Sequence, residues 1–313
     1  MYCILESAEK MKTFTEEHKR LYNEAKMVSN DYGQVTTHYY SVMAKVIEEY
    51  FNGNFHFVPP PKCADKNGRR RQKAQYKIKL EEALSVLHQR IGQCLRLEQG
   101  KHCLDIGCGI GGVIEDLAIT QATFTGLTIS PEEVEMGNAN FQKQSISSTC
   151  RIVQADCLQG IPVETASQDA AYAIYSLKYF PDLQPIIEEV ARVLKPGGLF
   201  LIYDLVKTSK YDKSNEEHRK LLDGLEFACG MPCLHSRQDL VDSMMDFDLV
   251  ESVDLSAESG HPFYYCFNSS TLFMWLVRSP IVKHLVKIGQ FCVSYLQAST
   301  FSTKSSSQAP STK

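Results

Sequence analysis

The chain has 313 residues, of which 43% are hydrophobic and 22% are charged, a balance typical of a folded globular protein rather than a disordered or fibrous one. Its formal net charge of −4 provides no general attraction for nucleic acid. The 11 cysteines form no C-x-x-C pair, and the first twelve residues lack the apolar stretch of a secretory signal. We therefore expect a cytoplasmic protein with reduced thiols.

The N-terminal part is predicted to be helical. Apolar and aromatic residues recur at helical spacing between residues 14 and 51, which predicts two helices ahead of the main domain. Three prolines at 59–61 then impose an extended segment, and a basic loop through Arg69, Arg70 and Arg71 follows, which we interpret as a solvated surface. Residues 1–79 are thus predicted to form a helical lid, an extended segment and a basic loop.

The central part is predicted to be an α/β domain. After helical periodicity at 80–97, short apolar runs alternate with helical patterns. Strands are predicted at 102–106, 123–127, 150–154, 170–174 and 199–203, and helices at 112–120, 131–145 and 183–194. This alternation predicts a doubly wound, mainly parallel, Rossmann-like sheet, with a nucleotide-binding core over residues 80–205.

The C-terminal part is less regular. We predict a helical and mixed lobe over residues 206–298, with helices at 215–229 and 236–245 and a strand at 249–255 that completes the sheet or covers the site. The apolar segment 281–296 carries charges that disfavour a membrane span, and it is predicted either to lie on a membrane surface or to pack against the core or a dimer partner. The polar residues 299–313 are predicted to be disordered.

A glycine-rich run at 104–112 gives the strongest local signal, because it follows a predicted strand and opens a predicted helix. Gly107, Gly109 and Gly112 also satisfy the GxGxxG pattern of dinucleotide-binding proteins. Such proteins normally place an acidic residue about 20 residues further on, at the tip of the second strand. This chain has Thr128 and Ile129 there, which argues against an NAD-linked oxidoreductase without excluding it.

The wider pattern resembles that of class I S-adenosylmethionine-dependent methyltransferases. Asp105 precedes the glycines, Asp156 follows the third strand, and a Lys-Pro-Gly-Gly turn at 195–198 precedes the last one. The resemblance implies S-adenosylmethionine as cofactor, without a metal, and a binding site made of Asp105, Gly107, Cys108, Gly109, Gly111, Thr128, Ile129, Asp156 and Cys157. In this site Asp156 would accept a hydrogen bond from the adenine amine, although it could equally be a helix or turn cap.

Two further segments resemble the sterol methyltransferase family. Residues 48–57 are similar to its Tyr-Glu-Tyr-Gly-Trp-Gly segment followed by Phe-His-Phe, and residues 172–181 are similar to its Tyr-Ala-Ile-Glu-Ala-Thr-Cys-His-Ala-Pro segment. The resemblance implies a sterol partner, held by the aromatic side chains of Tyr50, Phe51, Phe55 and Phe57. The alternative for these four residues is ordinary core packing.

The chain departs from this family where Tyr175 and Tyr179 replace the acid and the histidine of the second segment. An acid can stabilise the carbocation of side-chain methylation, whereas tyrosine carries no charge near pH 7. The pattern looks more like the branch that, in nematodes, methylates carbon 4 of the sterol A ring, where a 3-ketone can enolise. The resemblance then implies that Tyr175 or Tyr179 donates to the ketone, and that His56, Glu49 or a second tyrosine takes the proton.

Other functions stay open from the sequence. They are methylation of the sterol side chain at carbon 24, methylation of another lipid or a small metabolite, and a non-catalytic cofactor-binding role. His56 is also compatible with a purely structural histidine. A lipid substrate would suit an enzyme attached to the surface of the endoplasmic reticulum membrane.

Overall fold

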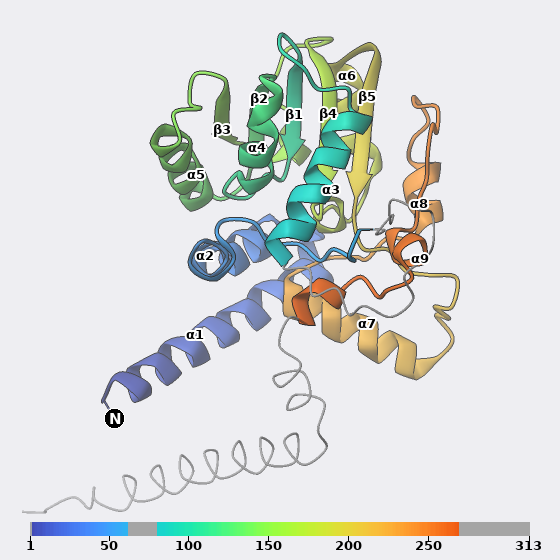
Figure 1. Cartoon of the computed structure of the whole chain (residues 1–313). Coiled ribbons are helices and arrows are strands. Elements are labelled where there is room, and N and C mark those ends of the chain that lie inside the picture. The colour runs from blue at the N-terminus through green and yellow to red at the C-terminus, as the bar shows by residue number, and fades with distance from the viewer. Residues whose placement is uncertain (1, 62–79, 269–313) are drawn as a thin grey trace, which may run out of the picture.

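A five-stranded parallel sheet lies at the centre of the computed structural model, which describes residues 2–61 and 80–268 (Figure 1). The strand order is β3-β2-β1-β4-β5. The strands are β1 (His102–Ile106), β2 (Thr123–Thr128), β3 (Cys150–Gln154), β4 (Gln168–Ile174) and β5 (Leu194–Tyr203). The chain runs outward from β1 to β3 and then returns to β4 on the other side of β1, so the predicted doubly wound parallel sheet is confirmed.

Both faces of the sheet are buried, because successive side chains of a strand point to opposite faces. One face carries Cys103, Phe124 and Tyr172 and packs against α3, α4 and α5. The opposite face carries Leu104 and Leu127 and packs mainly against α6. These helices are α3 (Leu80–Cys94), α4 (Gly112–Leu117), α5 (Pro131–Lys143) and α6 (Gln184–Val193). Their positions agree with the predicted helices to within a few residues.

The last strand begins earlier than predicted. Leu194 already pairs with Gln168, and regular pairing resumes where Leu199 lies opposite Ala170. The Lys-Pro-Gly-Gly turn at 195–198 is therefore an irregularity inside β5 rather than a separate turn before it. Gly197 adopts a φ of 77° there, which is the conformation that glycine tolerates best.

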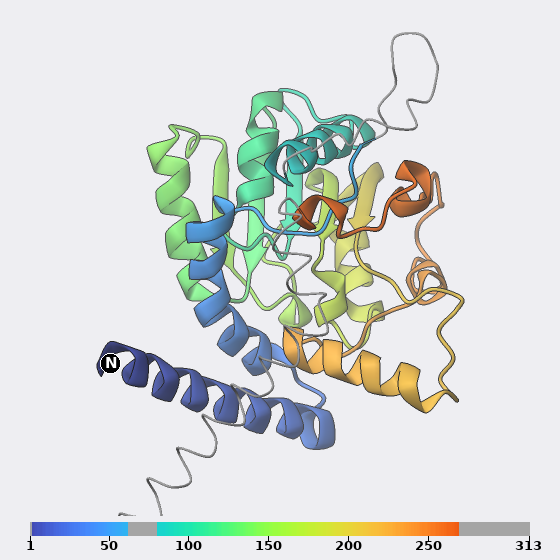
Figure 2. The same cartoon turned by 60° about the horizontal axis from the view of Figure 1, so that its bottom comes forward.

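The N-terminal helices lie at the end of the sheet at which β1 and β4 finish, the second one next to the strands and the first one packed against the second (Figure 1 and Figure 2). They are α1 (Tyr2–Glu24), a π-helical turn at Ala25–Ser29, and α2 (Gly33–Phe51). Leu21, Tyr22 and Val35 form a separate buried cluster against Phe227 of α7 (Glu216–Cys229), and the Tyr22 hydroxyl donates to the carbonyl of Met231 at 3.3 Å. The predicted helical lid is thus anchored to the C-terminal part of the chain.

The remaining C-terminal elements are short helices, α8 (Arg237–Asp242), α9 (Leu255–Ser259) and a 3₁₀ turn at Tyr265–Asn268. The predicted strand at 249–255 is wrong. Leu249 and Val250 are exposed and pair with no strand within the described residues, and the Asp254 side chain accepts from the backbone N–H groups of Ser256 and Ala257, which starts α9. Alternating apolar residues form a strand only where a neighbouring sheet edge supplies backbone partners.

Three predicted features, the basic loop with Arg69–Arg71, the apolar segment 281–296 and the polar tail 299–313, lie outside the described residues. Among the helices of 2–61 and 80–268, none combines the length and the apolar character that a bilayer span requires.

Candidate active site

A cavity opens at the carboxyl ends of β1, β2 and β4, beneath α2. The loops after these strands form its floor, and residues of α2 together with residues 53–56 form its cover. The cavity has a volume of about 1250 Å³, counted with the solvent at its mouth. The chain leaves the neighbouring strands β1 and β4 toward opposite sides, and doubly wound sheets bind ligands at such a switch point.

The glycine loop after β1 is shaped by close contacts that exclude side chains. The backbone N–H groups of Gly107 and Cys108 both donate to the carbonyl of Leu127 at 2.9 Å. Gly107 has a φ of 74°, and a Cβ atom there would lie 2.4 Å from Cβ of Ser176. A Cβ atom on Gly111 would lie 2.5 Å from Cζ of Phe141. Gly107, Cys108 and Gly109 line the cavity, whereas Gly111 supports the loop from behind.

Asp105, at the end of β1, presents a buried carboxyl group to the cavity. Its Oδ2 atom makes no hydrogen bond of standard geometry among the described residues, although the buried hydroxyl of Tyr172 lies close to this carboxyl group. Burial raises the pKa of this carboxyl group to about 8. A buried acceptor without a well-formed hydrogen bond is costly, so Asp105 is suited to accept hydrogen bonds from a cationic or donor group that enters the cavity.

A second buried carboxyl group, that of Glu133, reaches the tip of β2 from the first turn of α5. The Thr128 hydroxyl donates to it at 2.5 Å, and both side chains line the cavity beside Ile129. Burial raises the pKa of Glu133 to about 7. Sequence reasoning missed Glu133 because it sought an acid within the strand tip itself. The signal that could have located Glu133 is its position three residues after Ser130, which caps α5. The Ser130 hydroxyl accepts a hydrogen bond from the Glu133 N–H.

Asp156 and Cys157 follow β3 and also line the cavity. Oδ1 of Asp156 accepts from the backbone N–H of Leu158 at 3.0 Å and so caps a 3₁₀ turn at Cys157–Gln159. Asp156 is therefore a turn cap, which was the alternative to a role in binding adenine. The cap uses only one of the two carboxylate oxygens. Burial raises the pKa of the Cys157 thiol to about 12, which keeps it neutral.

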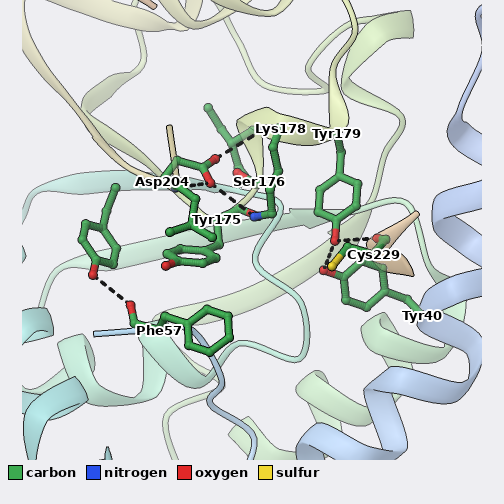
Figure 3. A network of polar contacts seen from close by, with 11 residues as sticks. Tyr40, Phe57, Tyr175, Ser176, Lys178, Tyr179, Asp204 and Cys229 are labelled. Atoms are coloured by element: carbon green, nitrogen blue, oxygen red, sulfur yellow. Dashed lines mark hydrogen bonds and ion pairs between the residues drawn. The ribbon is translucent and has the colours of Figure 1, made fainter. Parts of the chain in front are cut away.

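Tyr175 lies at the end of β4 in a left-handed conformation, with a φ of 56° (Figure 3). Its backbone N–H donates to the carbonyl of Tyr203 at 2.8 Å, and its own carbonyl accepts from Nζ of Lys178. Lys178 is paired with Asp204, at 3.3 Å between Nζ and Oδ1, and both side chains are buried. Burial raises the pKa of Tyr175, so its phenol is neutral, and its hydroxyl makes no hydrogen bond within the described residues.

Tyr179 connects three elements, as Figure 3 also shows. Its hydroxyl accepts from the hydroxyl of Tyr40, on α2, at 3.0 Å and donates to the carbonyl of Cys229, at the end of α7, at 3.3 Å. The contact between Tyr40 and Tyr179 could not be predicted, because the two residues are 139 positions apart and no local sequence pattern links them. Tyr179 thus uses its proton to tie the lid to the C-terminal helix, whereas Tyr175 keeps its proton available.

His56 is only 3% exposed and lines the cavity next to Tyr175, with 5.7 Å between the ring centres. Its Nε2 atom lies 3.1 Å from Nε2 of His88. Burial, aided by the ammonium group of Lys178, lowers the pKa of His56 well below its usual value, so the ring is neutral. The cavity wall therefore presents an imidazole acceptor beside a phenol donor.

The remaining residues predicted to take part in catalysis or substrate binding differ in whether they line the cavity. Phe55 lines the cavity and contacts Phe51 and Phe57, at 4.4 and 5.6 Å between ring centres. Phe51 and Phe57 themselves lie behind the lining. Glu49 is exposed and Tyr50 is 75% exposed, and neither lines the cavity. Within the described ranges, no group of three or more His, Cys, Asp or Glu side chains is placed to hold a metal ion.

Solved structures with a similar fold include a methyltransferase and a cyclase. A geranyl diphosphate C-methyltransferase from Streptomyces coelicolor, in complex with Mg²⁺, geranyl diphosphate and S-adenosyl-L-homocysteine, superposes with a TM-score of 0.62 and 21% identity, over 78% of this chain and 89% of that one. The [4+2]-cyclase SpnF superposes with a TM-score of 0.60 and 20% identity, over 72% and 76% of the two chains. At these identities the likeness shows the fold alone.

Sequence comparisons resolve the family. Residues 104–202 match a family model described as a methyltransferase domain. Sterol 24-C-methyltransferase of Yarrowia lipolytica is 31% identical over 75% of this chain and 59% of its own length. Sterol 4-C-methyltransferase strm-1 of Caenorhabditis elegans is 48% identical over 88% of this chain and 79% of its own length. With that identity and coverage, the chain belongs to the family of S-adenosylmethionine-dependent sterol methyltransferases.

Proposed function

We propose that this enzyme methylates carbon 4 of the A ring of a 3-keto sterol through its enol. The observation that carries the proposal is the neutral imidazole of His56 beside the neutral phenol of Tyr175 in the cavity wall. Enolisation needs a proton acceptor and a hydrogen-bond donor to the ketone oxygen, and this pair offers both. The 48% identity with a worm protein named for 4-C-methylation supports the same acceptor.

The residues around the glycine loop fit the cofactor. When bound, S-adenosylmethionine supplies the electrophilic methyl group that the enol carbon takes. We infer that Asp105, whose Oδ2 makes no hydrogen bond of standard geometry among the described residues, accepts from its ammonium group. Thr128 and Glu133 would hold the ribose hydroxyls, and the second oxygen of Asp156 would accept from the adenine amine.

The proton chemistry follows from the charge states. His56 would take the proton from carbon 4, and the electron pair of the broken C–H bond would move toward the carbonyl oxygen. The Tyr175 hydroxyl would donate a hydrogen bond to that oxygen and stabilise the developing negative charge. Because burial keeps both side chains neutral, neither has to lose or gain a charge before the ketone binds.

The same cavity is poorly suited to a side-chain carbocation. Its described lining contains the carboxyl groups of Asp31, Asp105, Glu133 and Asp156. The last three surround the inferred cofactor position, and Asp31 accepts from the backbone N–H of Gly33 at the mouth. The carboxylate that acts on Tyr175, at the position where the side-chain enzymes have an acid, is that of Asp204, which is outside the lining and is paired with Lys178.

The test is transfer of labelled methyl from S-adenosylmethionine to a panel of 3-keto sterols, 3-hydroxy sterols and side-chain alkenes, with the new carbon located by mass spectrometry. We expect label at carbon 4 of the 3-keto sterols only. Label at carbon 24 would refute the enol proposal and favour the side-chain reaction. Binding of S-adenosylhomocysteine without any sterol product would favour another acceptor or a non-catalytic role.

A further inference from the structure

Three polar side chains from separate elements connect the cavity wall to the surface. His56 lies in the cover, His88 is fully buried on α3, and Asp116 lies on α4 with a side chain that is 36% exposed. Nε2 of His56 is 3.1 Å from Nε2 of His88, and Nδ1 of His88 is 2.6 Å from Oδ2 of Asp116. The two contacts form one continuous hydrogen-bonded chain that ends at solvent.

The order of donors along this chain follows from the acceptor at its end. Nδ1 of His88 is 2.6 Å from the Asp116 carboxylate, which when ionised can only accept, and 3.5 Å from the amide nitrogen of Asn54. The shorter contact places a proton on Nδ1, which donates a hydrogen bond to Asp116. With His88 neutral, its lone pair lies on Nε2, and Nε2 of His56 carries the proton between the two rings. That leaves the lone pair of His56 on Nδ1, the ring nitrogen that does not face His88.

We propose that Asp116 and His88 form a proton relay that fixes His56 as a base and carries its proton to solvent. This inference rests on the proposed enol reaction, and it assigns roles to two residues that no sequence pattern singled out. His88 and Asp116 act through His56, so they are positioning residues rather than groups that touch the sterol.

The surroundings of His56 explain why a relay is needed. Its neighbours are the ammonium group of Lys178, the phenols of Tyr175 and Tyr203, and His88. The carboxylate of Asp204 is already paired with Lys178. None of these groups is a free anion, so a positive charge left on His56 would be desolvated and would face a cation. Passing a proton on to Asp116 removes that charge from the cavity.

The proton count balances over one turnover. His56 gains the carbon-4 proton on Nδ1 and gives its Nε2 proton to Nε2 of His88. His88 gives its Nδ1 proton to Asp116, which releases it to water. After product leaves, Nδ1 of His56 loses its proton to water in the cavity, and protons return along the chain to restore the starting tautomers. The net result is one proton released for each methyl group transferred.

The test measures proton removal without methyl transfer. A 3-keto sterol deuterated at carbon 4 is incubated with the full-length protein and S-adenosylhomocysteine, and loss of deuterium to water is followed by mass spectrometry. The variants are Asp116→Asn, which removes the final anion, and His88→Gln, which keeps an acceptor for His56 but cannot pass a proton. Glu115→Gln is the matched control, because it removes a carboxyl group from the adjacent position of α4.

A positioned general base contributes about 10²–10⁴-fold to a rate, so we expect deuterium loss to fall at least about tenfold in Asp116→Asn and His88→Gln. The control should stay within about twofold, and sterol affinity should not change in any of the three. Exchange by both relay variants at the wild-type rate would overturn the relay alone. A wild-type protein that neither exchanges deuterium nor methylates any sterol would overturn the proposed function as well.

A spectroscopic measurement tests the relay without any turnover. The ¹⁵N chemical shifts of the histidine rings report which nitrogen carries the proton. We expect His56 protonated on Nε2 and His88 on Nδ1 in the resting protein, and redistribution of the His88 tautomers in Asp116→Asn. A resting His56 with its proton on Nδ1 would refute the relay, because that nitrogen could then accept nothing from the sterol.

Discussion

Replacing Lys178 by methionine should damage both stability and catalysis, because the ammonium group has two buried partners. Its Nζ atom is 3.3 Å from Oδ1 of Asp204 and also donates to the carbonyl of Tyr175. The side chains of Lys178 and Asp204 are 8% and 3% exposed, so water cannot replace the lost contact. In Lys178→Met the carboxylate of Asp204 stays buried without its counter-ion, although it keeps a hydrogen bond from the Leu205 N–H.

Breaking a buried ion pair by removing one partner costs about 3–5 kcal/mol. The lost hydrogen bond to the Tyr175 carbonyl adds to this cost, because that contact helps to hold Tyr175 in its left-handed conformation. We therefore expect the free energy of unfolding, measured by urea denaturation, to fall by at least about 3 kcal/mol. The kcat of sterol methylation should fall as well, because the Tyr175 side chain loses its fixed position.

A second variant separates the two effects. Replacing a buried pair by apolar side chains is often neutral, so Lys178→Met combined with Asp204→Leu should recover most of the stability but not the kcat. The control is Lys220→Met, which breaks an exposed pair with Glu216 and should change stability by no more than about 0.5 kcal/mol. A loss below about 1 kcal/mol in Lys178→Met, or recovery of kcat in the double variant, would refute this reasoning.

Three further predictions concern single positions. Tyr175→Phe should fold normally and lower kcat by about 10²-fold or more, in steady-state assays with a 3-keto sterol, because it removes one donor to the developing oxyanion. Gly107→Ala should lower the urea midpoint and abolish S-adenosylhomocysteine binding in calorimetry, because its Cβ would lie 2.4 Å from Cβ of Ser176. Asp105 has a folded pKa raised from 3.8 to about 8, so the ligand-free protein should lose stability as the pH rises from about 4 to 8. Asp105→Asn should flatten that decline in urea titrations, and an unchanged slope would contradict the assigned protonation.

The cofactor half of the site could be predicted because its signals are local. The geometry of the loop after β1 is set by a few neighbouring residues, Asp105 and the glycines that follow it, so it can be predicted from a short stretch of sequence. The observed bounds of β1 and β3 agree with the predicted ones. Glu133 was missed because its carboxyl group reaches the cavity only after α5 packs against the sheet. The strand predicted at 249–255 was wrong for a related reason, since an apolar alternation carries no information about a sheet edge to pair with.

The substrate half could be predicted only as a set of residue types. The motif at 48–57 overlaps a segment that lines the cavity, but whether Glu49, Tyr50 or Phe55 faces inward depends on where α2 ends. Asn52 ends that helix in a left-handed conformation, and the chain beyond it turns Phe55 and His56 toward the strands. Tyr40, His88 and Asp116 come from three helices, and no spacing rule brings them together before the fold is known.

This division of the site explains how one fold can serve different acceptors. The groups inferred to hold S-adenosylmethionine lie between residues 105 and 156, inside the region that matches the general methyltransferase domain at 104–202. The groups that face the proposed reacting carbon come from α2, the segment after it and the loop after β4, and they are held by Lys178, Asp204 and Cys229. The loop after β4 also lies within 104–202, whereas α2 and the segment after it lie outside that region. The similarity to the worm sterol 4-C-methyltransferase extends over 280 residues and so reaches well beyond the domain. We therefore infer that the acceptor carbon in this chain is set by α2, the segment after it and the loop after β4, rather than by the residues inferred to hold the cofactor.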